Sequence, residues 1–356
     1  MPTQFPTSAK FAFGLISLIG VVFILNILKG ILIPLSFGGL LAMLLHPICH
    51  RLEGIKVPRV AAIFICIILV IGLITGLLML VINQLQVFSE ELPAYSSKIT
   101  ALLSKLQIFI EQKLNIRRGK QGAELQKYGL EALKNSGEYI SNFLSGTSNL
   151  LANASLVPIY VFFFLYYRDF LRHFLQKVFK TTKATKVNQI IAKIYEVVQS
   201  YLLGLFLVII IVAILNSVGL LFLKIDYAIF LGTFAAFLLL IPYIGITIGA
   251  LLPITIALLT KDSLLYAVAV LGLFLAVQAL ESNFITPLIV GSKVSINSFA
   301  AIISLLLGGQ LWGMAGLVLA LPFIAIIKVI FDNVDGLQPY GFLLGEADIK
   351  KKRTFL

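Results

Sequence analysis

Eight long stretches of this chain contain no charged side chain, and they limit its fold more than any other feature. A helix that crosses about 30 Å of hydrocarbon needs about 20 residues. Only 12% of the residues are charged, whereas a soluble domain carries about 25%. We therefore expect an all-α, polytopic integral membrane protein, a helical bundle of about eight spans whose main partner is the lipid bilayer. The stretches are residues 11–28, 31–49, 60–82, 148–167, 202–223, 227–260, 263–280 and 294–327.

The stretch 227–260 is too long for one straight crossing, and it contains Pro242 and Pro253. Proline removes a hydrogen bond from the helical ladder, and in lipid the freed carbonyl needs a partner from protein or water. We expect a broken, steeply tilted or hairpin element there. The chain divides into the first three transmembrane spans at 1–88, an extramembrane amphipathic helical segment at 89–147, a C-terminal transmembrane core at 148–335 and a cytoplasmic tail at 336–356.

The extramembrane segment mixes acidic and basic residues and is expected to lie outside the cytoplasm. Between Ile99 and Leu114 its apolar residues recur at helical spacing. Glu124 to Leu144 is expected to form a second helix. One interpretation of this segment is a cap or gate over a substrate path. The other is an amphipathic hairpin that packs on the bundle or lies in the lipid interface.

Basic residues are concentrated in two short connections, at 51–59 and 168–193. Lys and Arg in short loops mark the cytoplasmic side of a membrane protein, so both loops are expected there. With an even number of crossings both termini are cytoplasmic too. We expect a multi-pass protein of the bacterial inner (cytoplasmic) membrane. The same rule explains the net charge of +12, and since no nucleic-acid-binding motif accompanies that charge, no nucleic-acid partner is expected.

The residues that invite an enzymatic interpretation do not form a catalytic motif. His46 and His50 lie four apart, but Pro47 stands where a zinc peptidase of the HExxH type needs its glutamate. Cys49 and Cys66 lie in or beside apolar stretches, so neither a disulfide nor a metal site is expected from them. We expect no enzyme, no metal and no cofactor.

Polar and small residues in the last third of the chain are the candidates for a substrate path or for ion coupling. Pro242 and Pro253 bracket Gly245 and Gly249, whose GxxxG spacing suits either close helix packing or an unwound stretch that lines a cavity. Gln278 and Glu281 share a helix face. A carboxylate inside a membrane is usually functional, although Glu281 lies near the end of its span. Further candidates here are Asn283 and Pro287.

Four glycines in the last long stretch are expected to serve helix packing. They form a smooth strip on which another helix or a re-entrant segment can pack. They are Gly308, Gly309, Gly313 and Gly316.

These C-terminal blocks resemble, in order and spacing, those of the AI-2E family, which comprises the autoinducer-2 exporters and PerM-like permeases. Earlier blocks at residues 33–62 and 158–174 agree as well, and the likeness covers about residues 10–335. The chain departs from the family at Leu205, where a Gln is usual, and at Asn297 and Ser298, near a usual Pro. The C-terminal blocks are IPYIGITIGALLP, LESNFITPLIVGSKV and LLGGQLWGMAGLVLALPFIAIIKVIFD.

The resemblance implies eight-helix membrane proteins that assemble as homo-oligomers and act as secondary transporters. Export of autoinducer-2, a quorum-sensing signal, is described for some members and sodium–proton antiport for another. We expect a secondary transporter that exports a small polar solute such as autoinducer-2, with protons or sodium as coupling ions. No Walker motif is present to bind ATP. The alternatives are a cation (sodium)/proton antiporter and a non-transport scaffold whose segment 89–147 binds a partner.

Overall fold

The computed structural model describes residues 7–91, 155–179, 183–240, 244–290 and 296–346, together with 98, 100, 101 and 104. Every regular element that these residues form is a helix. Five helices are long and apolar enough to cross a membrane, and shorter apolar helices accompany them. The all-α, polytopic membrane fold predicted from the sequence is confirmed. The helices are α1 (Thr7–Ile27), α2 (Lys29–Gly54), α3 (Arg59–Glu91), α7 (Leu156–Tyr166), α8 (Arg168–Val178), α9 (Ala184–Phe222), α10 (Ala228–Leu238), α11 (Ile244–Thr260), α12 (Leu264–Leu280), the π-helical turn η2 (Glu281–Ile285), α13 (Thr286–Ile289), α14 (Ser298–Asn333) and α15 (Gln338–Leu344).

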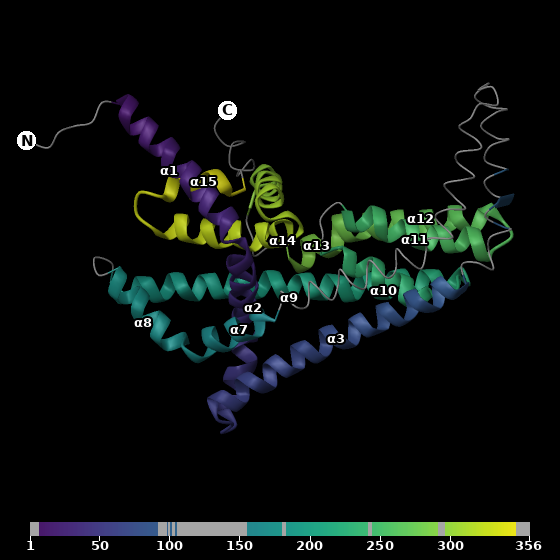
Figure 1. Ribbon diagram of the computed structural model, residues 1–356, viewed down its shortest axis with the longest axis horizontal. Helices are drawn as coiled ribbons and strands as arrows, with labels where there is room; N and C mark the ends of the chain where they lie inside the picture. The colour runs from purple at the N-terminus through teal and green to yellow at the C-terminus, as the bar shows by residue number, and fades with distance from the viewer. Residues whose placement is uncertain are drawn as a thin grey trace, which may run out of the picture.

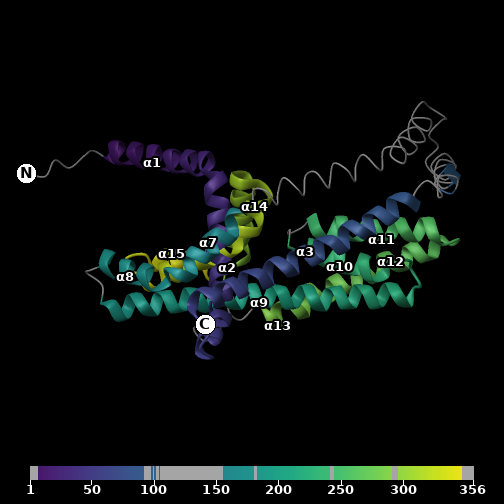
Figure 2. The same ribbon diagram turned by 60° about the horizontal axis from the view of Figure 1, so that its bottom comes forward.

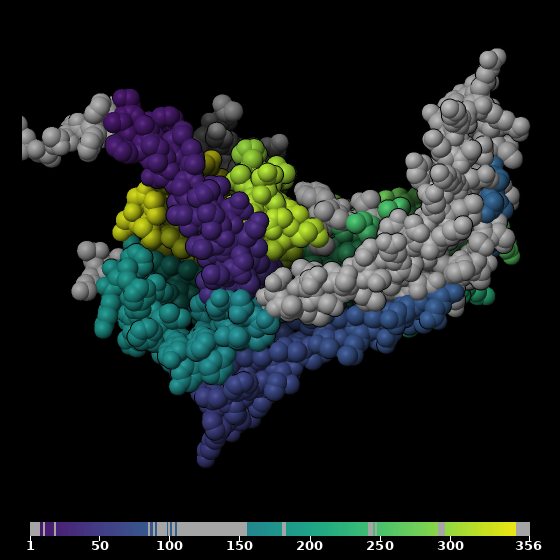
Figure 3. Space-filling view, viewed as in Figure 1, coloured from purple at the N-terminus to yellow at the C-terminus, as the bar shows by residue number. Residues whose placement is uncertain are grey.

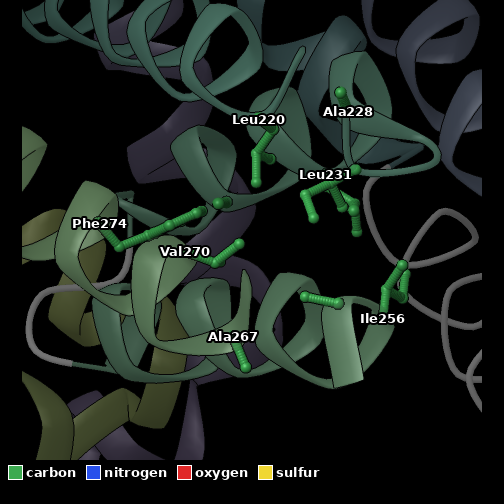
Figure 4. Close-up of a cluster of buried hydrophobic side chains, with 10 residues drawn as sticks. Leu220, Ala228, Leu231, Ile256, Ala267, Val270 and Phe274 are labelled. Carbon is green, nitrogen blue, oxygen red and sulfur yellow. The ribbon is translucent and has the colours of Figure 1, made fainter. Parts of the chain in front are cut away.

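Helix α9 is the longest of the described elements, and α10 and α12 pack along its second half (Figure 1). Helices α9 to α12 contribute to one apolar core, which includes Leu220, Leu231 and Ile256. Figure 4 shows these side chains pointing toward one another between the helices. Burial of such side chains against protein rather than lipid fixes the α9–α12 unit. Helix α1 makes few contacts and projects from the rest of the chain (Figure 2).

The stretch 227–260 folds back on itself as a hairpin. Helices α10 and α11 pack against each other, and Gly249 of α11 lies against Ala235 of α10. Lys261, after α11, forms an ion pair with Asp226, before α10, at 3.6 Å. Both ends of the element therefore lie together, and the hairpin among the three predicted alternatives is the observed one. Residues 241–243, with Pro242, lie outside the described part of the chain.

Helix α14 also turns back, which the sequence did not predict. Trp312 and Gly313 have non-helical backbone angles, and Gly313 has a φ of 60° that favours glycine. At this turn Gly308 faces Gly316 so closely that a Cβ on Gly308 would lie 2.5 Å from the Gly316 carbonyl oxygen. Asn297, at the start of α14, accepts a hydrogen bond from the backbone of Ala300 and donates its backbone N–H to Leu344 of α15. Gly308 and Gly316, on the two sides of the turn, therefore pack against each other.

The two basic connections contact each other. Arg168, at the start of α8, pairs with Glu53 at the end of α2, and both side chains are mostly buried. Arg59, at the start of α3, pairs with Asp169 at 2.9 Å and donates a hydrogen bond to the carbonyl oxygen of Leu165. The two loops therefore lie on the same side of the molecule, as their shared basic character predicts.

Two boundaries differ from those expected from uncharged stretches. Within the expected basic loop 168–193, residues 168–178 form α8 and residues 184–193 form the first turns of α9, because amphipathic helices continue through charged positions. Helix α3 continues to Glu91, past the expected end of the third span at 88. Most of the extramembrane segment 89–147, including its proposed second helix at Glu124 to Leu144, lies outside the described residues, as do 347–356 of the tail.

Candidate functional site

A small pocket lies where the α10–α11 hairpin meets α9 and α12. Helix α9 contributes residues two turns before its C-terminus, the hairpin contributes residues near its turn, and α12 contributes its last turn together with η2. The pocket therefore joins three elements that are far apart in sequence. Its lining residues are Val212, Asn216, Ala235, Leu239, Gly245, Gly249, Phe274, Val277, Gln278 and Glu281.

Two predicted glycines allow the hairpin to close against this pocket. A Cβ on Gly245 would overlap the carbonyl group of Leu238, so only glycine fits where α11 begins. A Cβ on Gly249 would lie 3.1 Å from the Cβ of Ala235 across the hairpin. Both glycines line the pocket. The GxxxG spacing therefore serves close packing at the wall of a cavity, and both glycines lie within helix α11 rather than in an unwound stretch.

Glu281 begins a π-helical turn at the end of α12. Such turns are rare, and they are frequent at functional sites because they displace side chains from the regular helical positions. One carboxylate oxygen of Glu281 accepts a hydrogen bond from Nε2 of Gln278 at 2.8 Å, and the other accepts one from the Thr286 hydroxyl. Gln278 and Glu281 thus lie together, as their spacing predicts. The two donors hold the carboxylate at the pocket.

Asn216 adds a polar group that sequence reasoning missed. Its side chain is 3% exposed, and its Oδ1 has no hydrogen-bond partner among the described residues. A buried acceptor left without a partner costs about 1–3 kcal/mol, so a native protein that keeps one usually has another use for it. The available signal was an amide in the middle of the uncharged stretch 202–223, since polar residues inside spans are usually functional.

The pocket holds about 20 Å³ of free space, which is enough for one water molecule or an ion of similar size. Its polar groups are the Glu281 carboxylate, the Gln278 amide and the Asn216 amide oxygen. Oxygen acceptors in this number suit a ligand that donates hydrogen bonds or carries positive charge. Among the described residues that line the pocket, Glu281 is the only charged one.

The remaining candidates lie elsewhere. Asn283 is exposed and donates to the carbonyl oxygen of Ala279 on its own helix, and Pro287 is exposed as well. Pro253 is fully buried inside α11. Leu205, at the position of the usual family glutamine, packs near Ile289 and does not line the pocket. The glycines from Gly308 to Gly316 belong to the turn in α14.

Comparison with known proteins finds a transporter family and relatives that are named as transport proteins. The family model described as "AI-2E family transporter" matches residues 12–336 of this chain. Two similar proteins carry the name "Putative transport protein". YueF of Bacillus subtilis (strain 168) is 26% identical over 316 residues, which cover 85% of this chain and 83% of YueF. MT0215 of Mycobacterium tuberculosis (strain CDC 1551 / Oshkosh) is 25% identical over 336 residues, which cover 93% of this chain and 90% of the relative.

Proposed function

Since the chain belongs to the AI-2E transporter family, we propose that it exports a small polar solute, of the kind that autoinducer-2 represents, and couples export to an ion at Glu281. The protein is a multi-pass membrane transporter, and its family and its relatives' names support that statement. To this statement we add three proposals, which are the kind of solute, the direction of its transport and the site of ion coupling.

The observation that carries the proposal is the position of the Glu281 carboxylate. A charged group inside a membrane protein is expensive and is usually part of an ion or substrate path. Nε2 of Gln278 donates to one oxygen of this carboxylate, and the Thr286 hydroxyl donates to the other. A proton or cation that binds the carboxylate competes with these two donors. Proton gain or loss can therefore change the polar groups that face a bound solute.

The size of the pocket requires movement during transport. About 20 Å³ accommodates one water molecule, so an organic solute enters only when the α10–α11 hairpin and α12 separate. The α10–α11 contact is built on small residues, with Gly249 against Ala235. Small residues leave little side-chain interdigitation to break, which suits an interface that opens and closes.

The proposed location is the bacterial inner membrane, with both termini in the cytoplasm. The contact between the two basic loops supports a shared, cytoplasmic side for them. The turns in α10–α11 and α14 remove two of the predicted crossings, so the number of crossings stays even. Lys186, in the basic stretch, pairs with Asp335 after α14 at 3.0 Å, which favours a C-terminus on the same side. Homo-oligomeric assembly is also proposed, from the resemblance to the family.

Uptake of labelled autoinducer-2 into inside-out membrane vesicles tests the exported solute. With a proton gradient imposed, vesicles that carry the protein are expected to accumulate the label above empty vesicles, and collapse of the gradient should release it. No accumulation by assembled protein would rule out autoinducer-2 as the solute. A matched set with the Glu196→Gln variant, which alters an exposed carboxylate of α9, should behave like the parent.

Cation/proton antiport is a second candidate, and the pocket volume favours it. A space of about 20 Å³ lined by carboxylate and amide oxygens fits a monovalent cation without any opening. If antiport is the activity, addition of sodium to vesicles should collapse a preformed pH gradient, whereas choline should not. A pH gradient that is equally stable with either salt would exclude sodium/proton antiport.

The Asn216→Leu variant is predicted to have opposite effects on stability and on transport. Removal of the unpartnered acceptor should raise the free energy of unfolding by about 1 kcal/mol, because the remaining side chain is apolar. Transport should fall at least about tenfold, the equivalent of about 1.4 kcal/mol of lost interaction with the solute or ion. Thermal unfolding in detergent and flux in vesicles measure the two quantities.

Ser217→Ala is the control for Asn216→Leu. The Ser217 hydroxyl is buried beside Asn216 in sequence and donates to the carbonyl oxygen of Ile229, and it does not line the pocket. Its removal should lower stability and leave flux unchanged. An Asn216→Leu protein that is destabilised but fully active would contradict the role given to Asn216.

A further inference from the structure

Helix α8 presents an unpartnered apolar face at the surface of the molecule. Its sequence places Phe170, Phe174 and Val178 on one side, at successive four-residue intervals. These three side chains are 68%, 54% and 55% exposed, and no residue of α8 is buried. Figure 3 shows α7 and α8, in teal, at the surface of the molecule. In a membrane protein such a face is stable against lipid.

An aromatic groove continues this face toward α2 and α7. It has a volume of about 310 Å³ and is lined only by apolar and aromatic residues, among them Leu35 of α2, Tyr160 and Phe164 of α7, and Leu171 of α8. A flexible hydrocarbon chain is the ligand that fits an open apolar groove next to lipid. The groove and the exposed face of α8 share Phe170.

Two cations of α8 have no carboxylate partner among the described residues. Asp169 pairs with Arg59, and Glu53 pairs with Arg168. Arg172 donates to the neutral amide oxygen of Asn188. Lys177 is exposed, with no ion pair to any described residue. By helical spacing Lys177, seven positions after Phe170, forms a cationic rim to the apolar face, whereas Arg172 lies on the far side of α8.

Both ends of α8 are held in place by other elements. The Arg168–Glu53 pair joins its first residue to α2. Near its end, Gln176 donates to the same Asn188 oxygen at 2.9 Å, which joins it to α9. The apolar face and the cationic rim are therefore presented in a fixed arrangement, and binding requires little ordering of the chain.

We propose that α8 and the adjoining aromatic groove form a binding site for an anionic phospholipid. One acyl chain lies in the groove beside Phe170 and Leu171, and the phosphate headgroup is bound by Lys177. Near an anionic surface each Lys or Arg contributes about a fivefold gain in affinity. The site is distinct from the Glu281 pocket, which is lined by other helices.

Quenching of a tryptophan on α8 by brominated lipids tests the site. Phe174→Trp places a probe on the exposed face of α8, and Leu275→Trp places the matched control on α12, which has no charged residue and exposes Leu275 by 62%. Each protein is reconstituted in mixtures with brominated phosphatidylglycerol or brominated phosphatidylcholine of identical acyl chains. The signal of the native Trp312 is measured on the parent protein and subtracted.

The Phe174→Trp probe is expected to favour phosphatidylglycerol over phosphatidylcholine by at least about fivefold, whereas the control shows a ratio near one. Combining Lys177→Gln with the probe should reduce the ratio to near one, while the quenching itself persists. Equal quenching by both lipids at position 174, or none by either, would overturn the proposal.

Discussion

The Glu281→Gln variant is expected to assemble normally and to lose gradient-driven transport. Gln has the shape of the carboxylate. Its amide oxygen can accept the hydrogen bond from Gln278 and its amide nitrogen can donate to the Thr286 hydroxyl, so packing at the π-helical turn is kept. It cannot gain or lose a proton. Hydrogen bonds to a charged group contribute about 1.5–3 kcal/mol each, so coupled flux should fall by at least about tenfold.

The measurement is solute or sodium flux in vesicles with the gradient imposed and then collapsed, at matched protein abundance. Glu196→Gln makes the same chemical change on the exposed surface of α9 and should leave flux unaltered. Coupled flux at the parent level in the Glu281→Gln protein would remove Glu281 from the mechanism.

The Gly316→Ala variant is expected to fold poorly. A Cβ at this position would overlap the carbonyl of Gly308 across the turn in α14. The obstacle is backbone rather than a flexible side chain, so the two halves of α14 must move apart. Overpacking of this kind costs about 1–3 kcal/mol and occasionally more. We expect a decrease of about 3 kcal/mol in the free energy of unfolding, together with reduced assembly of the transporter.

Gly72→Ala is the matched control, because Gly72 lies in a GxxxG pattern of α3 with Gly76, but a Cβ added there would meet no neighbouring atom within 4 Å. There the change removes only backbone freedom and should be neutral or stabilising by up to about 1 kcal/mol. Thermal unfolding of both variants in detergent gives the comparison. Equal stability of the two proteins would show that the α14 turn does not depend on Gly316.

The spans and an interruption within 227–260 could be predicted because both depend on local properties, whereas the hairpin was one of three alternatives for that stretch. Uncharged stretches of sufficient length specify spans, and Pro242 and Pro253 mark a stretch that cannot be one straight helix. The turn in α14 could not be predicted in the same way. It depends on the positive φ of Gly313 and on the contact of Gly308 with Gly316, and glycine in a membrane helix is equally compatible with packing on another helix.

Only some contacts of the candidate site could be predicted from the sequence. The π-helical turn explains which contacts were predictable and which were not. Helical spacing correctly places Gln278 beside Glu281, since the residues before the turn are regular. In a regular helix the polar residue near Glu281 would lie three or four positions further on. The extra residue of the turn brings Thr286, five positions on, to the carboxylate instead. Asn283 consequently points away from the pocket.

Asn216 illustrates what sequence alone cannot provide. It lies some 60 residues before Glu281 in the chain, and only the packing of α9 on α10 and α12 brings the two into one pocket. Its missing hydrogen-bond partner is a property of that packing. A single polar residue in an apolar span indicates a functional position, but it does not indicate which other residue it serves.

Binding to the purified protein tests most directly whether the Asn216–Gln278–Glu281 pocket is the transport site. Labelled autoinducer-2 and radioactive sodium are each measured by equilibrium binding to the parent protein and to the Asn216→Leu and Glu281→Gln variants. The parent should bind at least one of the two, saturably, and both variants should lose that binding by at least about tenfold while remaining folded. A parent protein that binds neither autoinducer-2 nor sodium would contradict the assignment of the pocket as the transport site. Full binding by both variants would contradict it as well.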